Sequence, residues 1–260
     1  MITRNEVSLI HSLKDKKARE EHRLFVAEGP KIADEILGSS WKIQRMFATD
    51  EYLDSHPSVR LSGDFEITPV SGSELGRISF LTTPHQVVLL VRLPADQDAE
   101  DENYKGLSLV LDQIQDPGNL GTIIRTADWF NVRHIYCSPD CADAFSPKVV
   151  QATMGSLLRV NTHYLDLSDF LGRIKEVPVY GAFASGNSIY ETKLEHPAFI
   201  VIGNESKGIR AGLHPLITHS ISVPRQVRSA ESLNASVAAG IVMNEFQRQL
   251  SDTLPEQKTI

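Results

Sequence analysis

The sequence contains very little cysteine and no histidine arrangement typical of a metal site. Cys137 and Cys141 are the only cysteines among 260 residues. Their spacing fits neither a zinc ribbon nor a redox pair, and no His-x-x-x-His motif stands nearby to complete a site. His214 and His219 are separated by Pro215 and do not form a metal-binding pair on one helix face. We therefore expect two free thiols, no bound metal and a reducing cytoplasm as the compartment.

Long apolar segments are also missing. No apolar run approaches the roughly 20 residues that a membrane-spanning helix requires, and the N-terminus lacks the apolar core of a signal peptide. The hydrophobic fraction of 41% and the charged fraction of 23% are typical of a globular protein without a membrane anchor. The net charge of −7 argues against a nucleic-acid-binding surface that covers the whole protein.

Several nucleotide-binding and hydrolase motifs do not occur. No G-x-G-x-x-G follows a predicted strand and no G-x-x-x-x-G-K-[ST] is present, so the sequence does not support a dinucleotide-binding or P-loop fold. The G-x-S-x-G elbow of the α/β-hydrolases is missing as well. An enzyme that holds another adenine-containing cofactor through a phosphate-cradling glycine loop is therefore disfavoured.

Strand and helix patterns alternate along the whole chain and predict two α/β domains. We place a small domain at 1–93 and a larger one at 106–260. Residues 94–105 carry five acidic side chains and hardly an apolar one, which is typical of an exposed linker. In the first domain, the predicted helices are 5–19, 30–37, 51–56 and 71–80, and the predicted strands are 24–27, 43–48, 65–70 and 85–92.

The alternation after residue 106 is more regular and predicts parallel β-α-β units. Its predicted strands are 107–111, 134–137, one that ends at 164, 179–184, 197–202 and 220–223. Its predicted helices are 119–130, 147–158, 169–175 and 232–250. Three segments where strands end are rich in Gly, Asn, Ser or Glu: 111–127, 200–208 and 223–240. Ligands of open α/β sheets bind at the edge formed by the carboxyl ends of the strands, so we expect the active site at these three segments.

Two residues of the first segment allow more than one interpretation. Asn119 stands at a predicted helix start, where a capping role accounts for it. Arg125 lies among apolar neighbours, where an arginine is rarely buried without a partner. A structural salt bridge and a functional anion contact explain Arg125 equally well.

The other two segments have structural explanations too. Glu205 can pair with Lys207 or cap the turn that follows the strand. Asn234 and Ser236 fall in the first turn of the last helix, for which we expect Ser232 as the N-cap.

Basic residues gather in one short segment near the N-terminus, in spite of the acidic total. They alternate with Asp15, Glu20 and Glu21, so a solvated helix face explains them, but a local patch of this kind also binds phosphate. The residues are Lys14, Lys16, Lys17, Arg19, Arg23 and Lys31.

Taken together, the three segments resemble the SpoU (TrmH-type) family of RNA ribose 2′-O-methyltransferases, within the SPOUT superfamily. The stretch 146–156 also looks like this family, and 24–29 resembles the small substrate-binding domain that precedes many members. That domain is similar to a group of RNA-binding ribosomal proteins. The matching motif residues are Asn119, Gly121, Arg125 and Ala127, then Ile202-Gly203-Asn204-Glu205 with Gly208, then Val223-Pro224 and Ser232-Leu233-Asn234-Ala235-Ser236.

The resemblance implies an α/β fold whose C-terminal SPOUT domain has a parallel sheet and a deep trefoil knot. It also implies a homodimer with the active site at the subunit interface. S-adenosylmethionine would lie in the knot, and the residues expected to bind it are Ile202, Gly203, Val223, Ser232 and Leu233.

The resemblance also nominates catalytic residues. Arg125 would contact the attacking 2′-hydroxyl or its adjacent phosphate, and in the expected dimer it would serve the partner's cofactor site. Because arginine stays protonated, we interpret it as a clamp rather than a base. Asn119, Glu205 and Asn234 would orient Arg125 and the ribose.

The expected substrate is ribosomal RNA, and the alternatives are transfer RNA or a non-catalytic role in RNA binding or ribosome assembly. The loop 225–231 lacks the glycine that family members commonly carry, and its arginines can add phosphate contacts. The residues expected to contact RNA are Lys14, Lys16, Lys17, Arg19, Arg23, Arg225 and Arg228.

Overall fold

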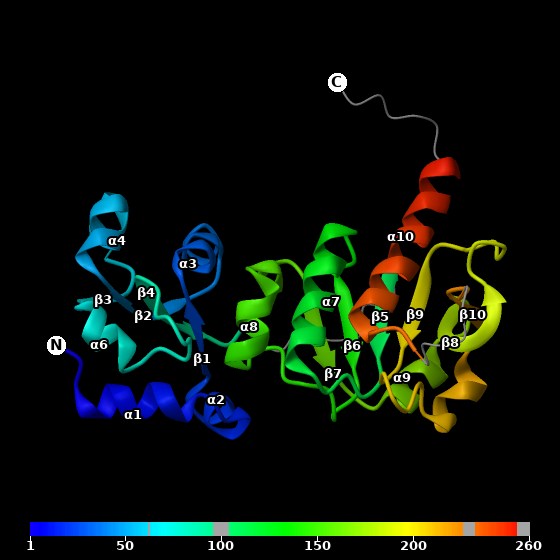
Figure 1. The fold of residues 1–260 in the computed structure, drawn as a ribbon, viewed down its shortest axis with the longest axis horizontal. Coiled ribbons are helices and arrows are strands. Elements are labelled where there is room, and N and C mark those ends of the chain that lie inside the picture. Colours follow the sequence, from blue (N-terminus) through cyan, green and yellow to red (C-terminus); the bar gives the residue numbers. More distant parts are fainter. Residues whose placement is uncertain (62, 96–103, 226–231, 254–260) are drawn as a thin grey trace. The chain divides into compact units, whose positions relative to one another are not determined.

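The computed structural model describes residues 1–61, 63–95, 104–225 and 232–253 (Figure 1). It divides into two compact units, one of Met1–Asp96 with Asp143–Leu158 and one of Gln97–Ala142 with Arg159–Ile260. Most of the predicted linker at 94–105 lies outside the described residues, and so does Arg228. The assignment of 1–93 and 106–260 to two domains therefore stays a prediction.

The first unit is built on a four-stranded sheet of mixed direction in the order β1-β4-β2-β3. The central strand β4 pairs antiparallel with β1 and β2, and β2 pairs parallel with β3. All of β1 is buried, as is β4 from Val87 to Val91, because both carry continuous apolar runs. The strands are β1 (Leu24–Glu28), β2 (Ile43–Ala48), β3 (Glu66–Pro69) and β4 (Val87–Arg92).

Short helices surround this sheet. Two of them replace the single helix predicted for 5–19, which was wrong. Thr3, not Asn5, caps the first, because its side chain accepts from the Glu6 amide while Glu6 reaches back to the Thr3 amide. The helices are α1 (Arg4–Ser12), α2 (Lys16–His22), α3 (Pro30–Leu37), α4 (Asp50–Ser55), α5 (Pro57–Leu61), α6 (Gly72–Gly76) and α8 (Pro147–Thr153), followed by a 3₁₀ turn at Ser156–Leu158.

The second unit contains a six-stranded sheet in the order β10-β8-β9-β5-β6-β7, and all its pairs are parallel, as predicted. The two central strands, β5 and β9, are buried along their whole length. After β5 the chain adds β6 and β7 on one side of β5. It then adds β8, β9 and β10 on the other side, so the strand order reverses beside β5. The strands are β5 (Leu107–Leu111), β6 (His134–Cys137), β7 (Asn161–Tyr164), β8 (Val179–Ser188), β9 (Ala198–Ile202) and β10 (His219–Ser222).

The helices of the second unit are α7 (Pro117–Trp129), α9 (Leu167–Arg173) and α10 (Ala235–Thr253), with a 3₁₀ segment at Ala211–Leu216. Helices α7 and α10 pack side by side (Figure 1). Within the described residues, no helix has the length and apolar character needed to cross a membrane. The predicted N-cap Ser232 was wrong. Helix α10 starts at Ala235, and the Asn234 side-chain oxygen accepts from the amides of Ser236 at 2.9 Å and Val237 at 3.3 Å.

Candidate active site

Three polar side chains from separate segments form one hydrogen-bonded cluster in the second unit. The Asn119 side-chain amide donates to Glu205 Oε1, and Asn234 Nδ2 donates to Asn119 Oδ1 at 2.8 Å. Asn119 belongs to the helix after β5, Glu205 follows β9, and Asn234 precedes α10. The structure thus brings together the three segments singled out in the sequence, at the edge where parallel strands present their carboxyl ends.

Asn119 is not the cap of α7, so that interpretation was wrong. Asp116 holds the N-cap position, and its side chain accepts from the Asn119 amide at 2.8 Å. The Asn119 side chain is therefore available for the bonds to Glu205 and Asn234. Asn234 has two roles, because its oxygen caps α10 while its nitrogen binds Asn119.

Glu205 occupies a tight loop that only glycine permits at its first position. A Cβ on Gly203 would lie 2.3 Å from the Gly208 carbonyl carbon and 2.4 Å from the Ile209 nitrogen. Two backbone hydrogen bonds between Asn204 and Gly208 close the loop, at 2.8 and 3.1 Å. Among the described residues no ion pair joins Glu205 to Lys207, the alternative considered from the sequence.

An ion pair between a buried aspartate and an exposed arginine fixes the far end of the same loop. Asp112 directly follows β5, is fully buried, and accepts from the Arg210 amide at 2.7 Å and from Arg210 Nε at 2.5 Å. Arg210 also pairs with Asp140 at 3.0 Å. Partial burial raises the pKa of Asp140, but hydrogen bonds from Ser138 and Gln113 and the charge of Arg210 outweigh it, so the pKa falls to about 2. This pair was not predicted from the sequence, although Asp112, directly after a buried strand, was a usable signal.

Arg125 lies midway along α7 and is exposed. It has no hydrogen-bond or ion-pair partner among the residues that the structure describes, so the salt-bridge interpretation finds no support there. Arg125 also makes no direct bond to Asn119, Glu205 or Asn234 in the described structure, so it does not belong to their cluster. An exposed guanidinium without a partner is available to an anionic ligand.

The residues expected to hold the cofactor end or follow two strands, β9 and β10, or precede α10. Ile202 ends β9 and is buried, Gly203 follows it, and Val223 is half-buried after β10. Ser232 and Leu233 are exposed, and Leu233 shows 45% of its surface. Half-buried Val223 and exposed Leu233 offer apolar side chains, and half-buried Gly203 offers bare backbone, a combination that suits an adenosyl group. The described residues contain no group of three His, Cys, Asp or Glu that could hold a metal ion.

The basic segment lies in the first unit, and it is not uniformly exposed. Arg19 is buried, donates to the carbonyls of Leu13 and Lys14, and pairs with Asp143 at 2.6 Å. This position leaves its guanidinium no surface for an RNA phosphate. The other basic side chains expected to contact RNA that fall within the described residues are exposed, namely Lys14, Lys16, Lys17, Arg23 and Arg225.

Comparison with known families identifies the chain. The sequence profile of the SpoU rRNA methylase family matches residues 106–244, and that of the MRM3-like substrate binding domain matches residues 4–89. The chain belongs to the SpoU rRNA methylase family. The predicted family and methyltransferase class are thereby confirmed.

Relatives match the SpoU chain over nearly its full length. The 23S rRNA (guanosine(2553)-2′-O)-methyltransferase RlmP of Bacillus subtilis is 29% identical, covering 89% of this chain and 91% of its own. A putative RNA methyltransferase of the TrmH family from Porphyromonas gingivalis superposes with a TM-score of 0.86 at 38% identity, covering 96% and 99%. An AdoMet-bound rRNA methyltransferase from Sinorhizobium meliloti superposes with a TM-score of 0.84 at 29% identity, covering 96% and 97%.

These comparisons confirm the predicted fold class and support S-adenosylmethionine as the cofactor. The trefoil knot, the homodimer, the cytoplasmic location and the roles of individual site residues stay predictions.

Proposed function

We propose that this protein transfers a methyl group from S-adenosylmethionine to the 2′-hydroxyl of a ribose in ribosomal RNA, in the cytoplasm. The observation that carries the proposal is the Asn119–Glu205–Asn234 cluster, in which three motif segments of a SpoU family chain meet. A protein that had lost its activity would not need polar side chains from three segments joined through Asn119 at this edge.

The proposed mechanism assigns positioning and charge stabilisation to the protein. S-adenosylmethionine supplies a methyl carbon that its sulfonium already activates. The chain must therefore align the ribose hydroxyl for in-line attack and allow its proton to leave. Arg125 acts as a clamp on the adjacent phosphate and stabilises the developing alkoxide, while water or phosphate takes the proton. The cluster fixes the loop after β9 and the start of α10, against which the cofactor and the ribose are oriented.

We further propose that two copies form a dimer through α7 and α10. These helices pack against each other, and each exposes a large apolar side chain, Trp129 at 85% and Val237 at 49%. Exposed apolar groups of this size favour a partner surface. Arg125 precedes Trp129 by one helical turn, so it would lie at the interface and serve the partner's site.

Ribosomal RNA is favoured over transfer RNA because of the first unit. One relative named as a 23S rRNA methyltransferase spans 89% of this chain and a solved rRNA methyltransferase spans 96%, while three other relatives with 23S rRNA names span 55% to 66%. Two solved structures with tRNA in their names cover 56% and 59% of it. An additional domain whose profile is that of a substrate binding domain suits a large RNA.

A methyl-transfer assay tests the proposal. Purified protein is incubated with tritiated S-adenosylmethionine and total RNA from a strain that lacks the gene, separated into ribosomal and transfer fractions. We expect label in the ribosomal fraction, at a nucleotide that resists alkaline cleavage. Label confined to transfer RNA would overturn the substrate, and absence of both label and cofactor binding would overturn the enzyme.

A further inference from the structure

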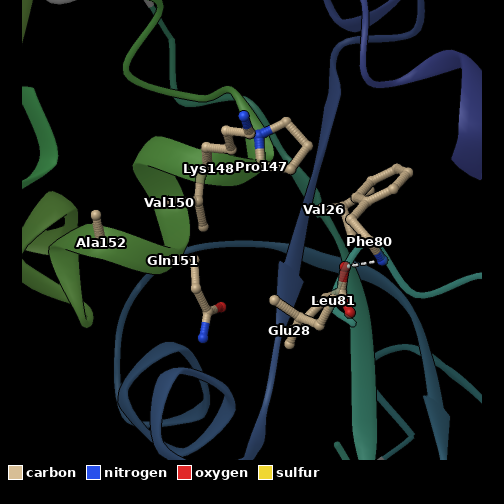
Figure 2. Close-up of a pocket in the computed structure, with 9 residues that line it drawn as sticks. All are labelled: Val26, Glu28, Phe80, Leu81, Pro147, Lys148, Val150, Gln151 and Ala152. Atoms are coloured by element: carbon tan, nitrogen blue, oxygen red, sulfur yellow. Dashed lines mark hydrogen bonds between the residues drawn. The ribbon is translucent and has the colours of Figure 1, made fainter. Parts of the chain in front are cut away.

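A cavity of about 270 Å³ lies within the first unit, whereas the site described above belongs to the second. Strand β1, the segment after α6 and helix α8 surround it (Figure 2). Its volume is slightly below the roughly 300 to 1,000 Å³ of typical small-molecule pockets, so it suits a ligand about the size of one nucleoside. Most of its wall is apolar and comes from Val26, Phe80, Leu81, Pro147, Val150 and Ala152.

The cavity wall contains a buried carboxylate. Glu28 is 5% exposed, and its two oxygens accept from the Ser79 hydroxyl at 2.5 Å and the Phe80 amide at 2.7 Å. Each oxygen keeps a second lone pair. No cation pairs with Glu28 among the described residues, and a carboxylate in such surroundings favours a ligand that brings further N–H donors.

A second polar group faces this carboxylate. Figure 2 shows Gln151 of α8 and Glu28 of β1 on facing sides of the cavity. The Gln151 amide can donate to a carbonyl oxygen of the same ligand. The ligand that suits the wall is therefore flat and apolar on its faces, with donors and a carbonyl on its edge.

Two lysines lie in or next to the wall of the cavity. Lys148 belongs to its lining and is exposed, and Lys14 Nζ lies 4.9 Å from the centroid of the Phe80 ring. A cation over an aromatic face is held there by the ring's charge distribution. Both ammonium groups can contact phosphate while the base enters the cavity.

We propose that this cavity receives one unpaired guanosine of the RNA and reads its base. Guanine presents two adjacent N–H donors, which match the two free lone pairs of Glu28, and a neighbouring carbonyl, which matches Gln151. Recognition of unstacked bases by apolar walls and edge hydrogen bonds is a general mode of sequence-specific RNA binding. The inference deepens the proposed function, because it rests on RNA as the substrate.

Binding of short RNAs to the full chain tests the cavity. The probes are two fluorescent single-stranded oligouridylates, one with a central guanosine and one with inosine, which lacks the 2-amino group. We expect the wild-type protein to prefer guanosine by roughly tenfold, the size of one edge hydrogen-bond contribution. Glu28→Gln should remove this preference. Gln151→Ala should keep it but weaken the binding of both probes, because guanosine and inosine carry the same carbonyl, whereas Glu51→Gln, an exposed carboxylate of α4, should change neither.

The variants separate recognition from folding and from chemistry. Glu28 also holds Ser79 and Phe80, so Gln151→Ala, which breaks no described hydrogen bond, serves as the test if Glu28→Gln unfolds. In methylation of ribosomal RNA, Gln151→Ala should raise KM with kcat unchanged. If Gln151→Ala binds both probes as tightly as the wild type does, or if the wild type shows no preference, the cavity proposal fails. Methylation of the RNA would still stand in that case, so the two failures are distinguishable.

Discussion

Arg125 has no described hydrogen-bond or ion-pair partner, in contrast to two other arginines of the second unit. Arg210 pairs with Asp112 and Asp140, and Arg159 pairs with Asp128. Replacing Arg125 by alanine therefore breaks no described bond and should leave thermal stability and S-adenosylmethionine affinity unchanged. We expect methyl transfer to fall by a factor of at least about 100, the scale of losing one stabilising group of a transition state.

Tritium transfer and calorimetric titration of the cofactor measure these two effects on one preparation. Arg159→Ala is the control, because Arg159 pairs with Asp128 at 2.9 Å and should change stability rather than activity. An Arg125→Ala protein that methylates at the wild-type rate would remove Arg125 from the mechanism.

The two thiols should differ in reactivity. A hydrogen bond from Cys137, aided by Ser138 and the Ile114 amide, lowers the pKa of Cys141 to about 7, although burial opposes it. The pKa of buried Cys137 is raised, chiefly because its thiol donates to Cys141. Alkylation of Cys141 should therefore rise with pH and be half-maximal near pH 7, while Cys137 stays unmodified in the native protein.

Mass spectrometry of peptides after timed iodoacetamide treatment follows each thiol separately. The lowered pKa also has a consequence for stability. The Cys141 thiolate stabilises the fold at a pH above its ordinary pKa of 9.0, and this contribution is lost as the pH falls through about 7. A Cys141 midpoint near pH 9 would contradict the hydrogen bonds assigned here.

At the scale of the element, the loop after β9 depends on one glycine. The Cβ of a Gly203→Ala variant would meet the backbone of Gly208 and Ile209, which no side-chain rotation can relieve. We expect a loss of roughly 1 to 3 kcal/mol in the free energy of unfolding and loss of S-adenosylmethionine binding, because the loop must move. Gly212→Ala is the matched control, since a Cβ there has no described neighbour within 4 Å.

Thermal denaturation and cofactor titration of both variants test this prediction. A Gly203→Ala protein with wild-type melting temperature and affinity would show that the loop tolerates a side chain. If Gly212→Ala lost as much stability, the effect would not be specific to the close approach of Gly203 to the backbone of Gly208 and Ile209.

Strands were easier to predict than helix starts. The apolar runs at 107–111 and 134–137 gave strand limits that the structure reproduces, because burial on both faces leaves a continuous signal. Helix starts at Thr3 and Asn234 were misplaced, since several neighbouring residues could cap and only tertiary contacts select one.

The three residues of the hydrogen-bonded cluster were singled out from the sequence, but their mutual contacts were not predicted. Asn119 and Glu205 are 86 positions apart in the sequence, and no periodicity connects two such residues. The order of the mixed sheet in the first unit and the Asp112–Arg210 pair escaped prediction for the same reason. The burial of Arg19 depends on Asp143, which lies 124 positions away.

At the scale of the whole molecule, the proposed dimer makes Trp129 a decisive residue. Trp129 is 85% exposed in the single chain, so Trp129→Glu removes no packing within it. We expect this variant to sediment as a monomer with an unchanged melting profile and to lose methyl transfer, because Arg125 would no longer reach a partner's site. Tyr190→Glu, at 55% exposure on the connection between β8 and β9, should stay dimeric and active.

Sedimentation equilibrium and the tritium assay give the two readouts. A wild-type protein that is monomeric yet active would overturn both the dimer and the role of Arg125 in the partner's site. A dimeric and inactive Trp129→Glu protein would place the interface elsewhere.

The segment Asp143–Leu158 lies between β6 and β7 in the chain, yet it packs within the first unit. Asp143 holds the buried Arg19, and Phe145 packs against Phe25 and Trp41. If a gene exchanged only the part that encodes Met1–Asp96 for that of a relative, the segment Asp143–Leu158 would have to pack against residues of a different sequence. Descendants of such an exchange would need compensating changes near the middle of the gene, so the two parts of the sequence are expected to evolve together.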